Sequence, residues 1–177
     1  SFRKALSIDK NSLRAYGLLG QLFLIQKSQD KAIQEFTNAL KVNPRYIQAH
    51  ILLAAIYDSK NDREKAKSHY REALKINPES PVAANNLAWI LAESGGNLDE
   101  ALSLAQTAAR ELHDNPTARD TLGWVYYKKG SYRAAIDALK ECVRQDSKSA
   151  VYHYHLGMAY LKNGEKAMAK ASLSEAL

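Results

Sequence analysis

The sequence is poor in several residues whose abundance marks particular protein classes. Its 177 residues include one cysteine, two tryptophans, four prolines and eight glycines. The single cysteine, Cys142, excludes an internal disulfide and a multi-thiolate metal site. No apolar run approaches the roughly 18 residues of a membrane-spanning helix, and the first residues lack a signal-peptide pattern. What remains, 46% hydrophobic and 25% charged residues, is the composition of an ordinary globular domain with a core.

The two ends of the sequence look like helix interiors. "SFRKALSIDK" at 1–10 has the pattern of the back half of an amphipathic helix, and the sequence closes on another, "AMAKASLSEAL" at 167–177. We therefore expect a fragment of a longer protein. The missing targeting pattern then carries no conclusion about location.

The charge is mildly basic, with a net charge of +6. Lysine and arginine are scattered along the chain with acids between them, and they do not gather into a block. A helical-repeat protein that binds nucleic acid needs basic residues along its binding face. The charge pattern therefore does not favour nucleic acid as a partner.

An internal repeat dominates the sequence. "ALKVNP" at 39–44 recurs as "ALKINP" at 73–78, a shift of 78 − 44 = 34 residues. The same shift, lengthened once by one residue in the turn "ESGGN", aligns several columns along the chain. They include a leucine column (Leu19, Leu53, Leu87, Leu122, Leu156), a small-residue column (Gly20, Ala54, Ala88, Gly123, Gly157) and a column ending in Cys142 and Ala176 (Ala39, Ala73, Ala108, Cys142, Ala176). A fixed period of this length indicates a repeat protein.

Within each repeat the apolar spacing is helical. Ala66, Tyr70 and Ala73, for example, follow one another at i, i+4 and i+7. No stretch alternates in the way that a half-buried β-strand does. The sequence therefore predicts an all-α fold.

The breaks between these stretches contain helix-terminating and helix-starting residues. Asn61 and Glu64 have the spacing of a capping box. Asn115 before Pro116 places a good N-cap in front of a proline at the first helical position. Gly130 stands where a left-handed residue would close a helix.

These columns resemble the tetratricopeptide repeat (TPR) family, whose unit of roughly 34 residues contains two antiparallel helices. In the first full copy the family skeleton is matched by Leu19, Gly20, Phe23, Ala32, Phe36, Ala39 and Pro44. Later copies depart from it, because the proline column becomes His113 and Ser147 and the phenylalanine column becomes Ala105, Leu139 and Leu173. The resemblance covers essentially the whole chain.

The resemblance implies an all-α, right-handed superhelical solenoid of antiparallel helix pairs. We expect a single TPR domain over residues 1–177, with a continuous core and five repeats after a leading half repeat. Residues 1–12 would be the second helix of the preceding repeat. The five repeats are 13–46, 47–80, 81–115, 116–149 and 150–177.

In TPR proteins the first helix of each repeat lines a concave groove, and the resemblance implies that peptides bind there. At about 100° per residue, Asn85 and Trp89 fall on the face opposite Leu87 and Leu91. This face is small or plain in the first two repeats and becomes aromatic and polar in repeats three to five. Tryptophan and tyrosine give large contact areas at low entropic cost, and asparagine can pair with a backbone amide. The predicted peptide-binding residues are Asn85, Asn86, Trp89, Asp120, Thr121, Trp124, Tyr127, Tyr154, His155 and Met158.

An alternative stays open for the most prominent of these residues. Trp89 and Trp124 can pack against the first helix of the next repeat and line the groove without touching a ligand. Asn85 and Asn86 can be solvated helix residues. A chaperone-tail adaptor is disfavoured, because the Lys, Asn and Arg clamp of that TPR sub-class is missing from the matching places.

Catalysis finds no support in the sequence, and we expect a non-enzymatic protein without cofactor or metal. His153 and His155 are two residues apart, which puts them on different faces of a helix. His50 falls in a packed column and is expected in the core or an interface. Cys142 occupies a small-residue column and is expected to be a buried packing residue.

The function predicted from these features is a protein–protein interaction scaffold that holds a peptide segment or a partner helix, mainly in repeats three to five. The alternative is an assembly module, which forms homo-oligomers or a larger complex through its ends or convex face. We expect a protein or peptide partner, no nucleic acid and no membrane insertion of this segment, with self-association left open. A weaker resemblance of "NNLAWILAE" and "DTLGWVYYKKG" to bacterial cell-envelope TPR proteins favours the envelope over the cytoplasm.

Overall fold

The computed structural model describes residues 12–177, and in that range the chain is helical throughout, without a strand. The predicted half repeat at 1–12 lies, except for its last residue, outside the described residues. The helices are α2 (Leu13–Ile25), α3 (Gln29–Val42), α4 (Ile47–Ser59), α5 (Arg63–Ile76), α6 (Pro81–Glu93), α7 (Leu98–Glu111), α8 (Pro116–Lys128), α9 (Tyr132–Gln145), α10 (Ala150–Lys162) and α11 (Lys166–Glu175). The all-α TPR fold predicted from the repeat is confirmed.

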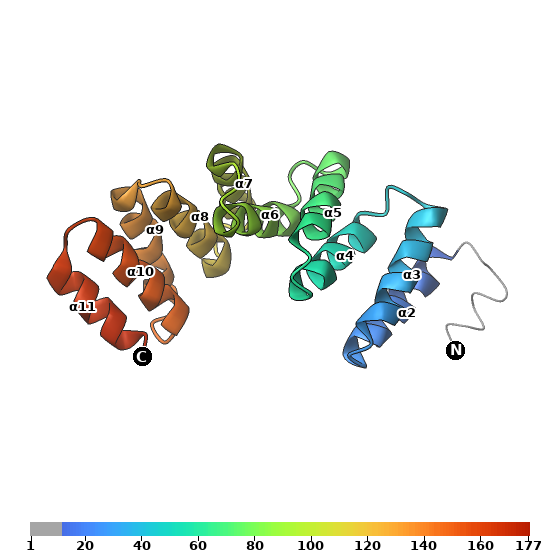
Figure 1. Ribbon diagram of the computed structural model, residues 1–177, viewed down its shortest axis with the longest axis horizontal. Coiled ribbons are helices and arrows are strands. Elements are labelled where there is room, and N and C mark those ends of the chain that lie inside the picture. The colour runs from blue at the N-terminus through green and yellow to red at the C-terminus, as the bar shows by residue number, and fades with distance from the viewer. Residues whose placement is uncertain (1–11) are drawn as a thin grey trace. The chain divides into compact units, whose positions relative to one another are not determined.

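Short turns join the helices into hairpins. The first helix of each repeat begins at Leu13, Ile47, Pro81, Pro116 or Ala150, which are the first residues of the predicted repeats. Within the hairpins α2 packs on α3, α4 on α5, α8 on α9 and α10 on α11 (Figure 1). Helix α10 also contacts α9 and α8 of the preceding repeat.

The contacts divide the chain into two compact parts, an N-terminal half up to Ala83 and a C-terminal half from Ala84 to Leu177. The N-terminal half has a core around Phe36, Leu53 and Ile56. The C-terminal half has a core cluster that includes Leu139 and Tyr160. The continuous single domain over 1–177 stays a prediction.

The small-residue column lies where the two helices of a hairpin meet. A Cβ atom added at Gly123 would lie 2.6 Å from Cγ of Leu139, and one at Gly157 would lie 2.6 Å from Cγ of Leu173. In the first repeat the neighbour of Gly20 is the ring of Phe36, at 2.5 Å. The glycines therefore make room for the large side chain of the partner helix, since the nearest atoms belong to that side chain and not to a backbone.

The helix ends confirm some of the predicted signals and correct one. Gly130 has a φ of 79°, and Asn115 accepts hydrogen bonds from the first turn of α8. The capping-box prediction at Asn61 is wrong, because Asn61 is in the left-handed region with a φ of 60° and closes α4. Its neighbour Asp62 is the N-cap of α5 and accepts from the backbone N–H of Lys65. A left-handed asparagine can replace glycine after a helix, and the next acid is then free to cap.

The two buried polar residues singled out in the sequence have structural roles. His50 is buried, and its Nε2 lies 3.0 Å from the carbonyl oxygen of Pro44. Cys142 is buried, and its Sγ lies 3.4 Å from the carbonyl oxygen of Pro116. Burial is the main reason that the pKa of the Cys142 thiol rises to about 12, so the thiol stays protonated and unreactive. Both predictions are confirmed.

Candidate functional site

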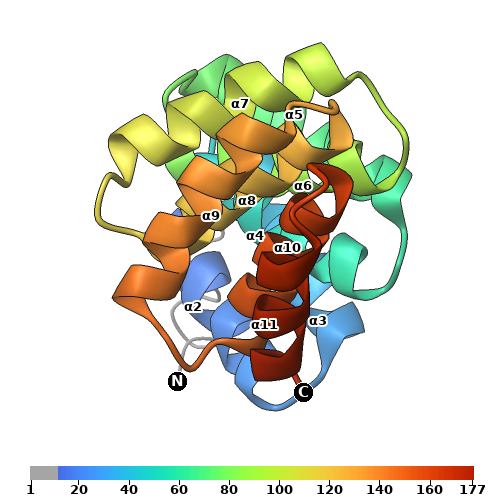
Figure 2. The same cartoon turned by 90° about the vertical axis from the view of Figure 1, so that its left-hand side faces the viewer.

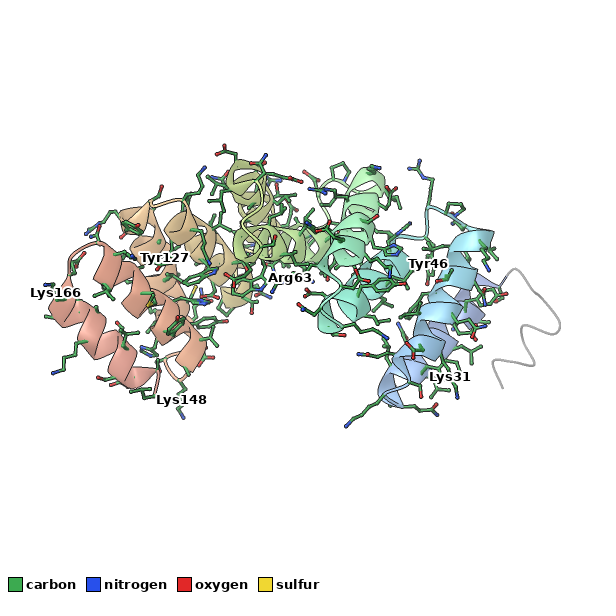
Figure 3. All side chains as sticks on the ribbon, in the orientation of Figure 1. Lys31, Tyr46, Arg63, Tyr127, Lys148 and Lys166 are labelled. Carbon is green, nitrogen blue, oxygen red and sulfur yellow. The ribbon has the colours of Figure 1, made fainter. Side chains whose placement is uncertain are left out.

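The predicted site residues lie on three successive first helices of the C-terminal half, α6, α8 and α10. Tyr127, for example, lies on α8 (Figure 3). The structure separates them by burial. Asp120, Thr121, Trp124 and His155 are buried; Asn85, Asn86, Trp89, Tyr127 and Met158 are partly buried; and Tyr154 is exposed.

Trp124 lies at the centre of an aromatic cluster. Its ring centroid is 4.2 Å from that of His155 and 4.6 Å from that of Tyr127, and both pairs are stacked. Only 7% of the residue is exposed. A tryptophan in this position contributes to the stability of the protein through its large buried area and its stacking.

Polar contacts hold the Trp124 indole in place. Its Nε1–H donates to Oε1 of Glu93 on α6 over 2.7 Å. The Nζ of Lys128 lies 3.0 Å from the same carboxylate oxygen and 5.1 Å from the centre of the Trp124 ring. The Trp124 indole thus packs between first helices of neighbouring repeats, as in the alternative to ligand contact given above.

Trp89 is more accessible than Trp124. Its ring centroid is 6.4 Å from that of Trp124 and 5.9 Å from that of His155. Tyr154, which is 46% exposed, lies next to the same imidazole at 5.7 Å. Trp89 and Tyr154 therefore form the accessible edge of the cluster, and Trp124 and His155 form its interior.

A buried histidine–aspartate hydrogen bond underlies the cluster. Nδ1 of His155 lies 2.8 Å and 3.0 Å from the two carboxylate oxygens of Asp120. Because a carboxylate only accepts, the Nδ1 atom carries the proton and donates it. Nε2 of His155 has no hydrogen-bond partner among the described residues. It is therefore the unpaired polar atom of this side chain within the described residues.

A second unpartnered atom belongs to Asn85. Its Nδ2 donates to Oδ1 of Asn86 over 3.2 Å, whereas its own Oδ1 is buried without a hydrogen bond. Leaving a buried acceptor unpaired costs roughly 1–3 kcal/mol. Asn85 stands one helical turn before Trp89 on α6.

An open pocket of about 630 Å³ adjoins Trp89 and is lined in part by residues of α10 and α11. These two helices pack on each other (Figure 2). The pocket is lined by Trp89, Ala150, Val151, Tyr154, His155, Leu173, Ala176 and Leu177. No acid, lysine or arginine is among these residues. The surface is mainly apolar, with the imidazole of His155 as its most polar side chain.

The predicted site residues do not include the side of this pocket formed by Val151, by Leu173 of α11, and by Ala176 and Leu177, which follow α11. The predicted residues all lie on the face of each first helix opposite the skeleton residues. Val151 falls three residues before Tyr154 on α10, so the same helical spacing could have found it. Leu173 belongs to a second helix, and Ala176 and Leu177 follow that helix, so the spacing on the first helices gave no signal for them.

The described residues show no grouping of three or more histidine, cysteine or acidic side chains that could hold a metal ion. In the same range, no helix combines the length and the apolar content needed to cross a lipid bilayer.

Sequence models of repeat families match most of the chain. A model described as "TPR repeat" matches residues 123–164. Three models described as "Tetratricopeptide repeat" match residues 13–46, 30–81 and 59–125. Among curated proteins, no sequence matches this chain.

Solved structures with the same fold cover nearly all of the chain. YrrB, described as a TPR protein with an unusual peptide-binding site, has a TM-score of 0.86 at 21% identity, over 99% of this chain and 90% of its own. MamA from Desulfovibrio magneticus RS-1 has a TM-score of 0.82 at 17% identity, over 93% of this chain and 92% of its own. PilF of Pseudomonas aeruginosa has a TM-score of 0.77 at 20% identity, over 95% of this chain and 76% of its own.

Identities this low indicate a shared fold and no more. The repeat columns, the helix hairpins, the family models and these structures nevertheless agree. The fold is that of a protein–protein interaction scaffold, and the chain belongs to the tetratricopeptide repeat family.

Proposed function

We propose that the C-terminal half binds a peptide segment of a partner protein, in a non-enzymatic manner, on the face formed by α6, α8 and α10. The observation that carries this proposal is the aromatic cluster, in which Trp89 and Tyr154 remain accessible beside a pocket of about 630 Å³. Aromatic side chains of this kind, next to a concave apolar surface, are the usual anchors of protein interfaces.

The residues of the predicted site then divide into two groups. Trp89, Tyr154 and Asn85 contact the peptide, because they are accessible or have an unpartnered polar atom. Trp124 and Asp120 hold these residues in position, because their own polar atoms are already paired inside the protein. A fixed set of anchors binds at lower entropic cost than a flexible one.

Similarity to YrrB adds support from the fold, since that structure is described as having a peptide-binding site. TPR proteins are generally non-enzymatic scaffolds, which agrees with the absence of catalytic patterns in the sequence.

The test is selection from a displayed library of random peptides on the immobilised protein. We expect the wild type to enrich a family of peptides that Trp89→Ala and Tyr154→Ala capture at least about tenfold more weakly, as for interface hot spots. Ile25→Ala, at a residue of the N-terminal half that is 79% exposed, is the matched control and should capture as the wild type does. Equal capture by all four proteins would rule the proposal out.

Self-association through the ends or the convex face stays a separate prediction. Light scattering of the chain at several concentrations tests it. A mass that rises with concentration supports assembly, and a constant monomer mass counts against it.

A further inference from the structure

The N-terminal half contains a pair of histidines that the proposed function does not use. His50 on α4 and His69 on α5 belong to one hairpin, and their Nδ1 atoms lie 3.0 Å apart. His50 is 7% exposed, and His69 is partly buried. The two residues are 19 positions apart in the chain, which is no metal-binding motif, so only the packing of α4 on α5 brings their rings together.

The backbone fixes the tautomer of His50. Its Nε2 lies 3.0 Å from the carbonyl oxygen of Pro44, and a carbonyl only accepts, so Nε2 carries the proton of the neutral ring. The lone pair of His50 is therefore on Nδ1, which faces His69. A histidine that ligates a metal usually donates its other ring N–H to a carbonyl or a carboxylate in this way, which orients the ring and makes the ligating nitrogen more basic.

His69 can present a second lone pair at the same place. In the neutral pair its Nδ1–H donates to Nδ1 of His50. Its Nε2 makes no hydrogen bond to the described residues, so the ring proton can move from Nδ1 to Nε2 at the cost of the hydrogen bond to His50 alone. The ring stays neutral in this exchange, and both Nδ1 atoms then offer a lone pair.

The spacing of the two nitrogens suits one coordination geometry. Imidazole–metal bonds of about 2.0–2.1 Å that span the observed 3.0 Å enclose an angle of about 91–97°, because half the span equals the bond length times the sine of half the angle. This angle is close to the right angle between adjacent ligands of a square-planar ion and smaller than the tetrahedral angle that zinc prefers. Square-planar nitrogen and oxygen ligands are characteristic of Cu²⁺ and Ni²⁺.

A carboxylate stands one helical turn after His69. Glu72 lies on α5, and its pKa is lowered mainly by its hydrogen bond to Lys75, with smaller contributions from Lys75, His50 and His69 as charges. Its carboxylate is therefore ionised and close to both rings. The Glu72 side chain is 45% exposed, so it can turn from Lys75 towards an ion held by the two imidazoles.

We propose that His50 and His69 form a binding site for a divalent copper or nickel ion, with Glu72 and water as the further ligands. Only the two imidazoles are in place, since the described residues contain no grouping of three such side chains. The ion would bind reversibly and hold α4 against α5 within the second repeat. Copper should bind more tightly than nickel, as it does to most nitrogen and oxygen ligands.

The probe is Cu²⁺ alone, added to the full chain after a chelator has removed other metals. The electron paramagnetic resonance spectrum of copper reports whether nitrogen ligates it, and the paramagnetic ion broadens the NMR signals of nearby residues. We expect nitrogen ligation, and we expect the backbone signals around His50 and His69 to broaden at the lowest copper concentrations.

Substitutions separate this site from the other histidines. His69→Gln should lower the copper affinity at least about tenfold, because it removes one of two ring ligands. Glu72→Gln should lower it by less than about tenfold, because water can take the place of the carboxylate. His113→Gln is the matched control at an exposed histidine and should bind copper as the wild type does. The NMR map needs no substitution, so it decides the question even if His69→Gln is less stable.

The inference is overturned if the bound copper has no nitrogen ligand, if the broadening centres on His113, His153 or His155, or if His69→Gln binds copper as tightly as the wild type. None of these results bears on the peptide-binding function, because library capture is measured without copper and depends on residues of the C-terminal half.

Discussion

His155 and Asp120 are 35 residues apart in the chain and form a buried hydrogen-bonded pair, with Nδ1 of the histidine 2.8 Å from Oδ1 of the aspartate. Asp120 lies on α8 and His155 on α10, so the pair joins the first helices of two successive repeats. The ring of Trp124 stacks on the imidazole of His155. The polar pair and the aromatic cluster therefore form one connected structure.

Breaking this pair should destabilise the protein more than removing it altogether. We expect Asp120→Ala to lower the free energy of unfolding by about 3–5 kcal/mol, because it leaves the buried His155 without its partner. Asp120→Leu combined with His155→Phe should cost less than Asp120→Ala alone. Urea denaturation of the single and double variants measures the coupling, and strictly additive losses would contradict a specific pair.

The two tryptophans should differ in their effect on stability. Trp124→Ala removes a buried ring and its hydrogen bond to Glu93, and we expect a loss of about 3–5 kcal/mol in the free energy of unfolding. Trp89→Ala removes a partly buried ring that makes no hydrogen bond to the described residues, and it should cost less than half as much. Thermal and urea unfolding of both variants tests this order, and equal losses would show that Trp89 is an equally important packing residue.

A double alanine variant of Trp89 and Trp124 is unsuitable for binding experiments, because it combines loss of a proposed ligand contact with loss of packing. Trp89→Ala alone is therefore the informative variant for ligand capture.

A methyl group added at Gly123 should be poorly tolerated, because the side chain of Leu139 faces this position. Gly123→Ala places a Cβ 2.6 Å from Cγ of Leu139, and we expect it to cost about 1–3 kcal/mol through overpacking. Adding Leu139→Val should recover part of that loss, because it shortens the clashing side chain. The measurement is the urea midpoint of the single and double variants. If Leu139→Val simply adds its own cost, the clash is not the cause.

A histidine pair in the N-terminal half links stability to pH. In neutral His50, Nε2–H donates to the carbonyl of Pro44, so Nδ1 accepts from Nδ1–H of His69 over 3.0 Å. Burial, and then the neighbouring His50, lowers the pKa of His69 below its ordinary value of 6.5, against a smaller opposing effect of Glu72. The folded state therefore binds a proton at His69 less readily than the unfolded state does.

This half should lose stability as the pH falls through about 6.5, because the unfolded state then takes up more protons. We expect the melting temperature to drop between about pH 7 and about pH 5, and the drop to be smaller in His69→Gln. His113→Gln, at an exposed histidine, is the control and should keep the wild-type pH profile. An unchanged pH profile in His69→Gln would show that another group causes the acid loss.

The fold was predictable because the same pattern of residues recurs in every repeat. The leucine and small-residue columns recur in every repeat, and the first helices begin at the predicted repeat boundaries. The prediction at Asn61 is wrong because asparagine fits two different roles, an N-cap and a left-handed residue after a helix. Asparagine is a good N-cap and also the commonest substitute for a left-handed glycine.

The interior of the candidate site was harder to predict. A helical wheel places Asp120 and Trp124 opposite the skeleton residues, but it contains only one helix and cannot show that α10 covers them. The pairing with His155 depends on two neighbouring columns of successive repeats, Asp120 in one and His155 in the next. An acid and a histidine in neighbouring columns of adjacent repeats predict a paired contact only if the packing of helices between repeats is already known.

The central claim is that Trp89 touches a bound peptide whereas Trp124 supports it from within. Because the chain has only two tryptophans, each can be observed alone, in Trp124→Phe and in Trp89→Phe. The measurement is tryptophan fluorescence during titration with a library-selected peptide. We predict that the emission of Trp89 moves to shorter wavelength and saturates with the peptide, while the emission of the buried Trp124 changes little. An unchanged Trp89 emission at peptide saturation would contradict the claim.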